Sequence, residues 1–563
     1  MASASLVHIP QASSFFTPQP KYQWDNLKRS KDFPRPNVIP VMKTFLRWMV
    51  IGLAGLGMLV ALFYAEEDLR GWHAWNKFKH QWEAKGEKFD FASVVPPTVP
   101  DDQNFAMSPV WIAEIKYLWP SNPERARSWY GNRIDGEEVS RIVSQLPVGV
   151  SGLVGNNWAS QKMPAPPEMS SHWTTAGATD LKPWQSYYRD LETTTPAAAI
   201  PIAPQPQSPA ADVLLALSKF DPVIEKLRQD SALPDSRFPV IYTTEDPAAI
   251  LLPHLAVVKR YAQVLQLRAS AELQNGQNKK ALDDVKLTLR LNDSVRNETF
   301  LISHLVRIAV VTIALQPVWE GLADHKWSDA QLTELDSELA KLDFLADYKF
   351  TMRGEMVFQG RIIDYLKRHP EQLQNMSGDG RVAKQSLTTR IGWHLIPSGW
   401  YYQNRLSCAR PMVELYIPLA DTNRGIISPK AALHADTAAQ AETKHPNRYN
   451  TIEKLLLPGL GNAVRRFAYG QESADLARVA IALERFRLAH GEYPGSLDAL
   501  EPRFIEKLPQ DIINGQPLHY RRSLDGKFLL YSVGWNETDD DGQVGLQKNG
   551  VFDNAKGDWV WKN

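Results

Sequence analysis

`AVVKRYAQVLQLRASAELQNGQNKKALDDVKLTLRLND`, residues 256–293, decides the fold class of this 563-residue chain. Apolar residues recur every three or four positions on both sides of Asn275-Gly276, which is the period of a helix with one buried face. Glycine tolerates the left-handed conformation that ends a helix, so Gly276 predicts a turn. The stretch is expected to form a helical hairpin.

Helical patterns continue around this hairpin and predict a helical domain over residues 211–450. `FLISHLVRIAVVTIAL`, residues 300–315, is apolar but includes a histidine and an arginine. It is shorter than the roughly 20 residues that cross a bilayer, so it is expected to be a buried core helix. Ser328 and Gln331 have the spacing of a capping box, which predicts the start of a further helix.

Composition limits the classes of function. The chain exceeds what one core usually supports, so more than one folded unit is expected. Lys plus Arg and Asp plus Glu both number 63, and the net charge is zero. No basic field is available to hold nucleic acid, and nucleic-acid binding is not expected. The single cysteine, Cys408, excludes an intramolecular disulfide and a cysteine-rich metal site.

A membrane segment is predicted at `WMVIGLAGLGMLVALFYA`, residues 48–65, which contains no charge. Its 18 residues would span roughly 27 Å as a helix. Basic residues precede it in excess, and acidic residues follow it at once. The positive-inside rule therefore makes residues 1–47 a cytoplasmic tail and leaves the bulk of the chain outside the cytoplasm, with the lipid bilayer as a partner.

A cleaved signal peptide is the rival interpretation, because the residues from Met42 resemble a charged n-region. Cleavage after Ala65 would place Phe63 where a small residue is needed, so an uncleaved anchor is favoured. Both Met1 and Met42 remain open as translation starts.

Two segments follow the anchor. Residues 66–100 are predicted to contain a helix with an aromatic stripe, Trp72, Trp75, Phe78 and Trp82. Such a stripe either packs on the ectodomain or lies at the level of the lipid headgroups. Residues 101–210 are predicted to be a proline-rich irregular segment. Within it, residues 164–209 carry nine prolines and are predicted to form an extended, polyproline-like strap, either a linker or a segment draped over a domain. Tryptophan residues around the strap favour the draped form.

The hairpin resembles one tetratricopeptide repeat. The positions that match are Leu265, Ala269, Gly276, Ala281, Leu282, Leu289 and Leu291. Glu272 departs from the family, which has an aromatic residue there. No second copy occurs at this period, so a single repeat-like hairpin is expected rather than an array.

The C-terminal residues 451–563 have an α+β pattern. A long helix is predicted to end at Gly491, and a short helix to begin with Ser496 as its N-cap. Residues 518–522 and 527–533 alternate like strands around an Asp-Gly turn, and a strand-like `DWVW` follows an acidic loop.

This order of elements resembles the globular head of the major pseudopilins of type II secretion, over roughly residues 471–545. The resemblance implies that the acidic loop binds calcium through Asn536, Asp539 and Asp541. Oxygen ligands of this kind suit a hard cation. No pilin cleavage site directly precedes the head, so a processed filament subunit is not expected.

The whole layout resembles a family of uncharacterised single-pass bacterial envelope proteins, a resemblance that implies no activity. It implies the bacterial inner membrane as the location, with the N-terminus in the cytoplasm. The fold predicted is mainly α: a transmembrane helix, a helix-rich ectodomain and a small α+β pseudopilin-like module.

The sequence contains no G-x-S-x-G, H-E-x-x-H, Walker A or G-x-G-x-x-G motif. It therefore favours a non-enzymatic scaffold or assembly protein of the envelope with protein partners, and it assigns no catalytic residue and no cofactor apart from possible calcium. One alternative is an envelope hydrolase, for which His304, Arg307 and Glu355 are the candidate polar cluster. Another is a calcium-dependent adhesion or sensing module.

Overall fold

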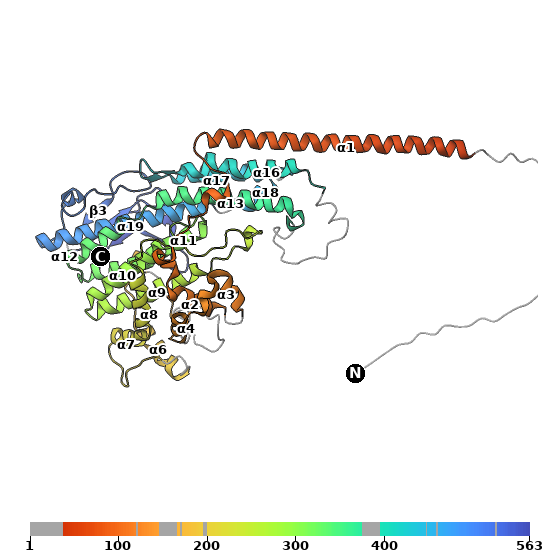
Figure 1. Ribbon diagram of the computed structural model, residues 1–563. Coiled ribbons are helices and arrows are strands. Elements are labelled where there is room, and N and C mark those ends of the chain that lie inside the picture. The colour runs from red at the N-terminus through yellow and green to blue at the C-terminus, as the bar shows by residue number, and fades with distance from the viewer. Residues whose placement is uncertain are drawn as a thin grey trace, which may run out of the picture. The chain divides into compact units, whose positions relative to one another are not determined.

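The computed structural model describes residues 38–119, 122–145, 166–168, 172–194, 200–373, 395–445, 447–457, 460–523 and 526–562. The chain is mainly helical, with 65% of it in helices and 7% in strands, and a small strand-containing module lies at its C-terminal end (Figure 1). This confirms the prediction of a mainly helical fold with a small strand-containing module at the C-terminal end. The chain divides after Phe63, and residues 64–563 form one compact unit, which we call the ectodomain after the location expected from the sequence.

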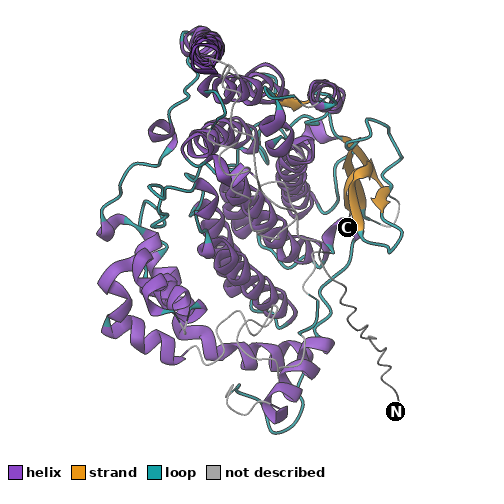
Figure 2. Ribbon diagram, turned by 90° about the vertical axis from the view of Figure 1, so that its right-hand side faces the viewer, coloured by secondary structure: helices purple, strands orange, loops and turns teal. Residues whose placement is uncertain are grey.

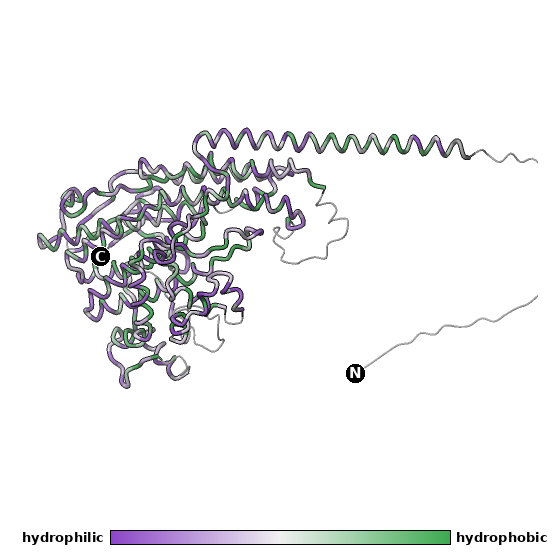
Figure 3. The backbone as a smooth tube through the Cα atoms, viewed as in Figure 1, coloured by the Kyte–Doolittle hydropathy of each residue, from purple (hydrophilic) through white to green (hydrophobic). Residues whose placement is uncertain are grey.

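The helix α1 (Val38–Glu83) contains the whole apolar stretch without interruption. None of its most apolar 18-residue window is buried within the described part of the chain, and Figure 3 shows the apolar residues along it in green. By length and composition, α1 could cross a membrane. Residues 1–37 of the predicted cytoplasmic tail lie outside the described residues.

The described parts of residues 101–230 form the first layer of the ectodomain, around an aromatic core that they share with residues 238–313. Its helices are α2 (Pro109–Leu118), α3 (Pro123–Tyr130), α4 (Glu137–Gln145), α6 (Lys182–Thr194), α7 (Pro209–Leu217) and α8 (Asp221–Asp230). The prediction of an irregular segment over residues 101–210 is therefore wrong. Prolines begin helices here: Pro109 and Pro209 occupy the first turns of α2 and α7, where proline loses no hydrogen bond.

One piece of the strap is as expected. Residues 200–208 have no helix or strand, and Ile200 and Ala203 are buried against the first layer.

The central layer is built from long helices. These are α9 (Pro253–Gln274), α10 (Asn278–Asp293), α11 (Leu301–Ala323), α12 (Asp329–Leu339), α13 (Phe344–Arg368) and α19 (Leu460–His490). The predicted hairpin is α9 and α10, and Gly276 has a φ of 73°. The capping box of Ser328 and Gln331 is formed at the start of α12.

The helix α11 lies in the middle of this layer and contacts α9, α10, α13 and α19. In the 18-residue part of α11 that is apolar enough to span a membrane, 67% of the residues are buried. These apolar side chains therefore pack in the protein core. The prediction of a buried core helix at residues 300–315 agrees with this position.

The remaining elements complete the ectodomain. They are α16 (Ser398–Pro411), a π-helical turn (Met412–Tyr416), the strands β1 (Ala420–Asp421) and β2 (Ile426–Ile427), α17 (Pro429–Thr443) and α18 (Thr451–Leu456). Pro458-Gly459 predicts an interruption of the helical stretch 451–490, and these two residues lie outside the described residues.

The C-terminal strands lie to one side of the helices (Figure 2). β3 (His519–Arg522), β4 (Phe528–Ser532) and β7 (Trp559–Lys562) form an antiparallel sheet in the order β3-β4-β7, as the hairpin and the `DWVW` pattern predict. β5 (Val544–Leu546) and β6 (Phe552–Gly557) form a second hairpin. Residues 497–500 form a 3-10 helix, and Ser496 makes no side-chain cap, which corrects the predicted N-cap.

The predicted boundary between residues 211–450 and 451–563 does not separate two units. α19, from the second of these segments, packs on α11, α12 and α13 from the first. The Trp319 Nε1–H donates to the Lys562 carbonyl at 2.8 Å. Because these contacts join both segments in one core, neither segment has a complete core alone.

Candidate functional site

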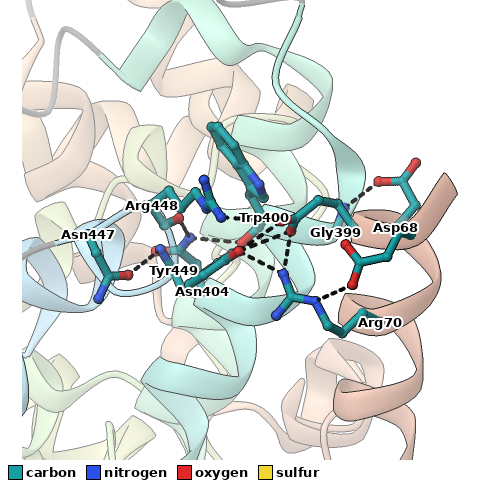
Figure 4. Close-up of polar contacts among 10 residues, drawn as sticks. Asp68, Arg70, Gly399, Trp400, Asn404, Asn447, Arg448 and Tyr449 are labelled. Atoms are coloured by element: carbon teal, nitrogen blue, oxygen red, sulfur yellow. Dashed lines mark hydrogen bonds and ion pairs between the residues drawn. The ribbon is translucent and has the colours of Figure 1, made fainter. Parts of the chain in front are cut away.

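The part of α1 that belongs to the ectodomain is held by a cluster of polar groups and glycines, which we call the clasp (Figure 4). The clasp consists of Glu67, Asp68, Arg70, Gly71, Gly399, Arg448 and Tyr449. It joins α1 to the start of α16 and to the segment before α18.

Two glycines bring the backbones of α1 and α16 into contact. A Cβ added at Gly399 would lie 1.9 Å from the carbonyl oxygen of Glu67, and one at Gly71 would lie 2.4 Å from the carbonyl oxygen of Gly399. The Gly399 N–H donates to the Asp68 carboxylate at 2.7 Å, as Figure 4 shows. Asp68 therefore satisfies an N-terminal amide of α16 and places negative charge at the positive end of that helix.

The Glu67 carboxylate is the buried centre of the clasp, with 2% of the residue exposed. It accepts hydrogen bonds from Arg70 Nη2 at 2.7 Å and from the Tyr449 hydroxyl at 2.9 Å, and Arg448 Nη2 lies 3.4 Å away. The hydrogen bond that Arg70 donates to Tyr449 raises the pKa of Arg70. A buried carboxylate is tolerated only with such partners, so the clasp loses stability if one is removed.

The aromatic stripe predicted on this helix packs mainly on the ectodomain. Trp75 and Phe78 are buried and contact Phe89, with ring centroids 5.5 and 5.9 Å apart. The Arg405 guanidinium lies 4.7 Å from the centre of the Trp75 ring. Trp72, which is 49% exposed, is left on the surface.

His304 and Arg307, predicted as part of a polar cluster, do contact each other inside the core. Arg307 Nη1 lies 3.3 Å from His304 Nδ1 and pairs with Asp347 on α13. His304 Nε2 lies 2.8 Å from the Glu298 carbonyl. Burial and the neighbouring Arg307 lower the pKa of His304 to about 3, and burial raises the pKa of Asp347.

Glu355 does not join this cluster. Within the described part of the chain it has no hydrogen bond or ion pair with His304 or Arg307, and the backbone of Leu301 bonds to it instead. The carboxylate that completes the cluster is Asp347, two helical turns earlier on α13. His304 and Arg307 are at most 2% exposed, so this is a buried structural ion pair rather than a site open to substrate.

The acidic loop after β4 is organised by its own hydrogen bonds. Asp539 accepts from the Tyr531 hydroxyl at 3.0 Å and from the Asp541 N–H at 3.0 Å, and the latter bond lowers the pKa of Asp539. Asn536 Nδ2 donates to Asp540 at 2.8 Å.

Three further side chains face or close this loop. Arg521 lies 3.7 Å from Asp541, and His519 lies 3.5 Å from Asp539. The buried Asp558 accepts from the Gly542 N–H at 2.7 Å. Among the described residues, no three His, Cys, Asp or Glu side chains are grouped to hold a metal ion. Calcium binding through Asn536, Asp539 and Asp541 stays a prediction.

No family model, curated protein or solved structure matches this chain. The resemblances to a tetratricopeptide repeat and to pseudopilin heads remain expectations from the sequence.

Calcium is predicted to stabilise the ectodomain if these three residues bind it. A ligand at a hundredfold excess over its Kd adds about 2.7 kcal/mol, which for a unit of this size raises the melting temperature by about 2–3 °C. Asp539→Ala with Asp541→Ala should remove this increment, whereas Glu506→Ala, outside the loop, should keep it. Equal melting of residues 64–563 in millimolar calcium and in chelator would show that the loop binds no calcium.

Stability is predicted to fall as the pH rises from 6 to 8. Burial raises the pKa of Glu355 and of Glu453 to about 7, whereas the unfolded carboxyls ionise near 4.5. Between these values the folded state binds more protons, so stability decreases with pH by about 2–3 kcal/mol for the two groups together. Thermal melting at each pH measures the stability, and the stability of Glu355→Gln should depend less on pH than that of the wild type. A flat wild-type profile would contradict it.

Proposed function

We propose that the protein is a membrane-anchored extracytoplasmic scaffold or assembly protein of the bacterial cell envelope. The orientation proposed places the N-terminus in the cytoplasm and residues 64–563 outside it. The excess of basic residues before the apolar stretch and of acidic residues after it supports this orientation.

The observation that carries the proposal is the clasp. A tether whose only task is to keep a domain near a membrane can end in a flexible linker. Here α1 continues past its apolar stretch to Glu83, and its first turns in the ectodomain are fixed by two glycines and a buried carboxylate. The ectodomain therefore holds the chain that directly follows the apolar stretch in one place, which suits a protein that presents its surfaces to partners in the envelope.

The hydrolase alternative is not proposed, because the candidate cluster is a buried Arg307–Asp347 ion pair from which Glu355 is separate. The calcium-dependent alternative depends on the acidic loop and on the melting experiment described above.

Chemical cross-linking in intact cells tests the proposal. The wild-type chain should appear in assemblies larger than its own 63.6 kDa, and these should diminish in Gly399→Leu, which opens the clasp without altering the anchor. Gly495→Leu is the matched control, because a Cβ at Gly495 meets nothing within 4 Å. Wild-type protein that remains a monomer in cells would contradict a scaffold role.

A further inference from the structure

The segment 395–399, which leads into α16, runs beside α1 in the same direction. The Tyr64 hydroxyl donates to the Leu395 carbonyl. Four residues further along each segment, the Gly399 N–H donates to Asp68, as Figure 4 shows. Both bonds join residues that are 331 positions apart, so the two segments advance in step. Each residue of 395–399 therefore lies level with its counterpart on α1.

This register fixes the distance of segment 395–399 from the apolar stretch of α1. Tyr64 belongs to that stretch, residues 48–65, so Leu395 lies level with its end. A helix rises about 1.5 Å per residue, so Asp68 lies at most roughly 5 Å beyond Ala65 along the axis. The polar layer on each side of a bilayer is about 5–7 Å thick. If α1 crosses a membrane, as proposed above, segment 395–399 lies within this layer.

Apolar side chains are exposed at this level of the ectodomain. Leu395 is 59% exposed, and Leu69, one turn past the apolar stretch, is 66% exposed. The exposed Trp72 follows on α1. Single exposed apolar residues are ordinary on a protein surface, but several at one level mark a surface that binds an apolar partner. At the level of the polar layer, that partner is lipid, and tryptophan is enriched there.

The backbone at Leu395 is held from two sides. Its carbonyl accepts the hydrogen bond from Tyr64, and the next residue, Ile396, packs on the apolar cluster that includes Ile363 and Leu366 of α13. The exposed side chain of Leu395 is therefore presented by the folded ectodomain at a fixed height beside α1.

We propose that the ectodomain touches the bilayer through Leu395, whose side chain contacts the upper acyl chains of neighbouring lipids beside Leu69 and Trp72. The inference rests on the proposed single-pass anchor and adds a second membrane contact to it. This contact lies far from α1 in the sequence. Together with α1, it determines which face of the ectodomain is turned toward the membrane.

Quenching of fluorescence by brominated lipid tests the proposal. The full chain carrying Leu395→Cys is labelled with bimane and reconstituted in phosphatidylcholine vesicles whose acyl chains are brominated near the headgroup. The native Cys408 is buried and stays unlabelled. Bromine quenches a fluorophore only at close range, so a loss of signal reports contact with lipid. We expect at least a twofold loss relative to vesicles of unbrominated lipid.

Two control positions separate this inference from the anchor itself. Leu59→Cys, in the apolar stretch, should also be quenched, because Leu59 is 67% exposed on α1. Leu488→Cys should keep its fluorescence, because Leu488 is 44% exposed near the end of α19, on the far side of the ectodomain from the start of α16 (Figure 1).

The outcomes are distinct. If neither Leu59→Cys nor Leu395→Cys is quenched, α1 does not enter the bilayer, and the proposed anchor fails together with the inference. If Leu59→Cys is quenched and Leu395→Cys is not, the anchor stands and the inference is overturned. Equal quenching of Leu395→Cys and Leu488→Cys also overturns it, because the contact would then not be specific to segment 395–399.

Discussion

Gly399→Ala is expected to destabilise the ectodomain by about 3 kcal/mol or more, at the upper end of overpacking effects. The new Cβ would lie 1.9 Å from the Glu67 carbonyl oxygen and 2.4 Å from its carbon. These are backbone atoms of a helix, so no side chain can rotate away to relieve the clash. Either α1 or α16 must shift, and the shift would lengthen the bond from Gly399 N–H to Asp68.

Hydrogen exchange measures this result directly. Amides of residues 64–83 should exchange faster in Gly399→Ala, and the melting temperature of residues 64–563 should fall. Gly495→Ala is the matched control, because its Cβ would enter open space. Identical exchange and melting in the two variants would contradict the close contact between the helices.

Arg307→Met is expected to cost 3–5 kcal/mol, roughly the penalty for breaking a buried ion pair. The substitution leaves the Asp347 carboxylate buried without its main partner, because the other nearby cation, Arg296, lies 3.7 Å away and is 42% exposed. Removing both charges is expected to recover most of the loss, since two apolar side chains leave no unpaired group.

A double-mutant cycle checks this expectation. Denaturant unfolding of wild type, Arg307→Met, Asp347→Leu and the double variant should give a favourable coupling energy of about 3 kcal/mol or more, because each single loss is large and the double variant recovers most of it. Additive losses would show that the two side chains do not act as a pair. Arg296→Met is a useful control, because Arg296 is the more exposed of the two arginines near Asp347 and should cost far less.

Local patterns predicted much of the helical architecture. The hairpin at Gly276, the capping box at Ser328 and the β3–β4 hairpin depend on residues that are neighbours in sequence, so periodicity and turn chemistry specify them. The prediction of an irregular segment over residues 101–210 was wrong because prolines such as Pro109 and Pro209 start helices there instead of preventing them.

The contacts of the candidate site could not be predicted in the same way. Asp68 and Gly399 are 331 residues apart, and Glu67 and Tyr449 are 382 apart. Nothing in the sequence near Gly399 shows that a helix backbone lies against it. Arg307 could be recognised as a buried cation that needs a carboxylate, but the choice between Asp347 and Glu355 required their positions on α13.

We propose a single-pass protein with its ectodomain outside the cytoplasm. Labelling of single-cysteine variants with a membrane-impermeant maleimide tests it most directly, because the native Cys408 is 1% exposed and burial raises the pKa of its thiol. In intact spheroplasts, Gly495→Cys should be labelled at once, and Lys28→Cys only after permeabilisation. Labelling of Lys28→Cys together with protection of Gly495→Cys in the intact spheroplasts would contradict the account.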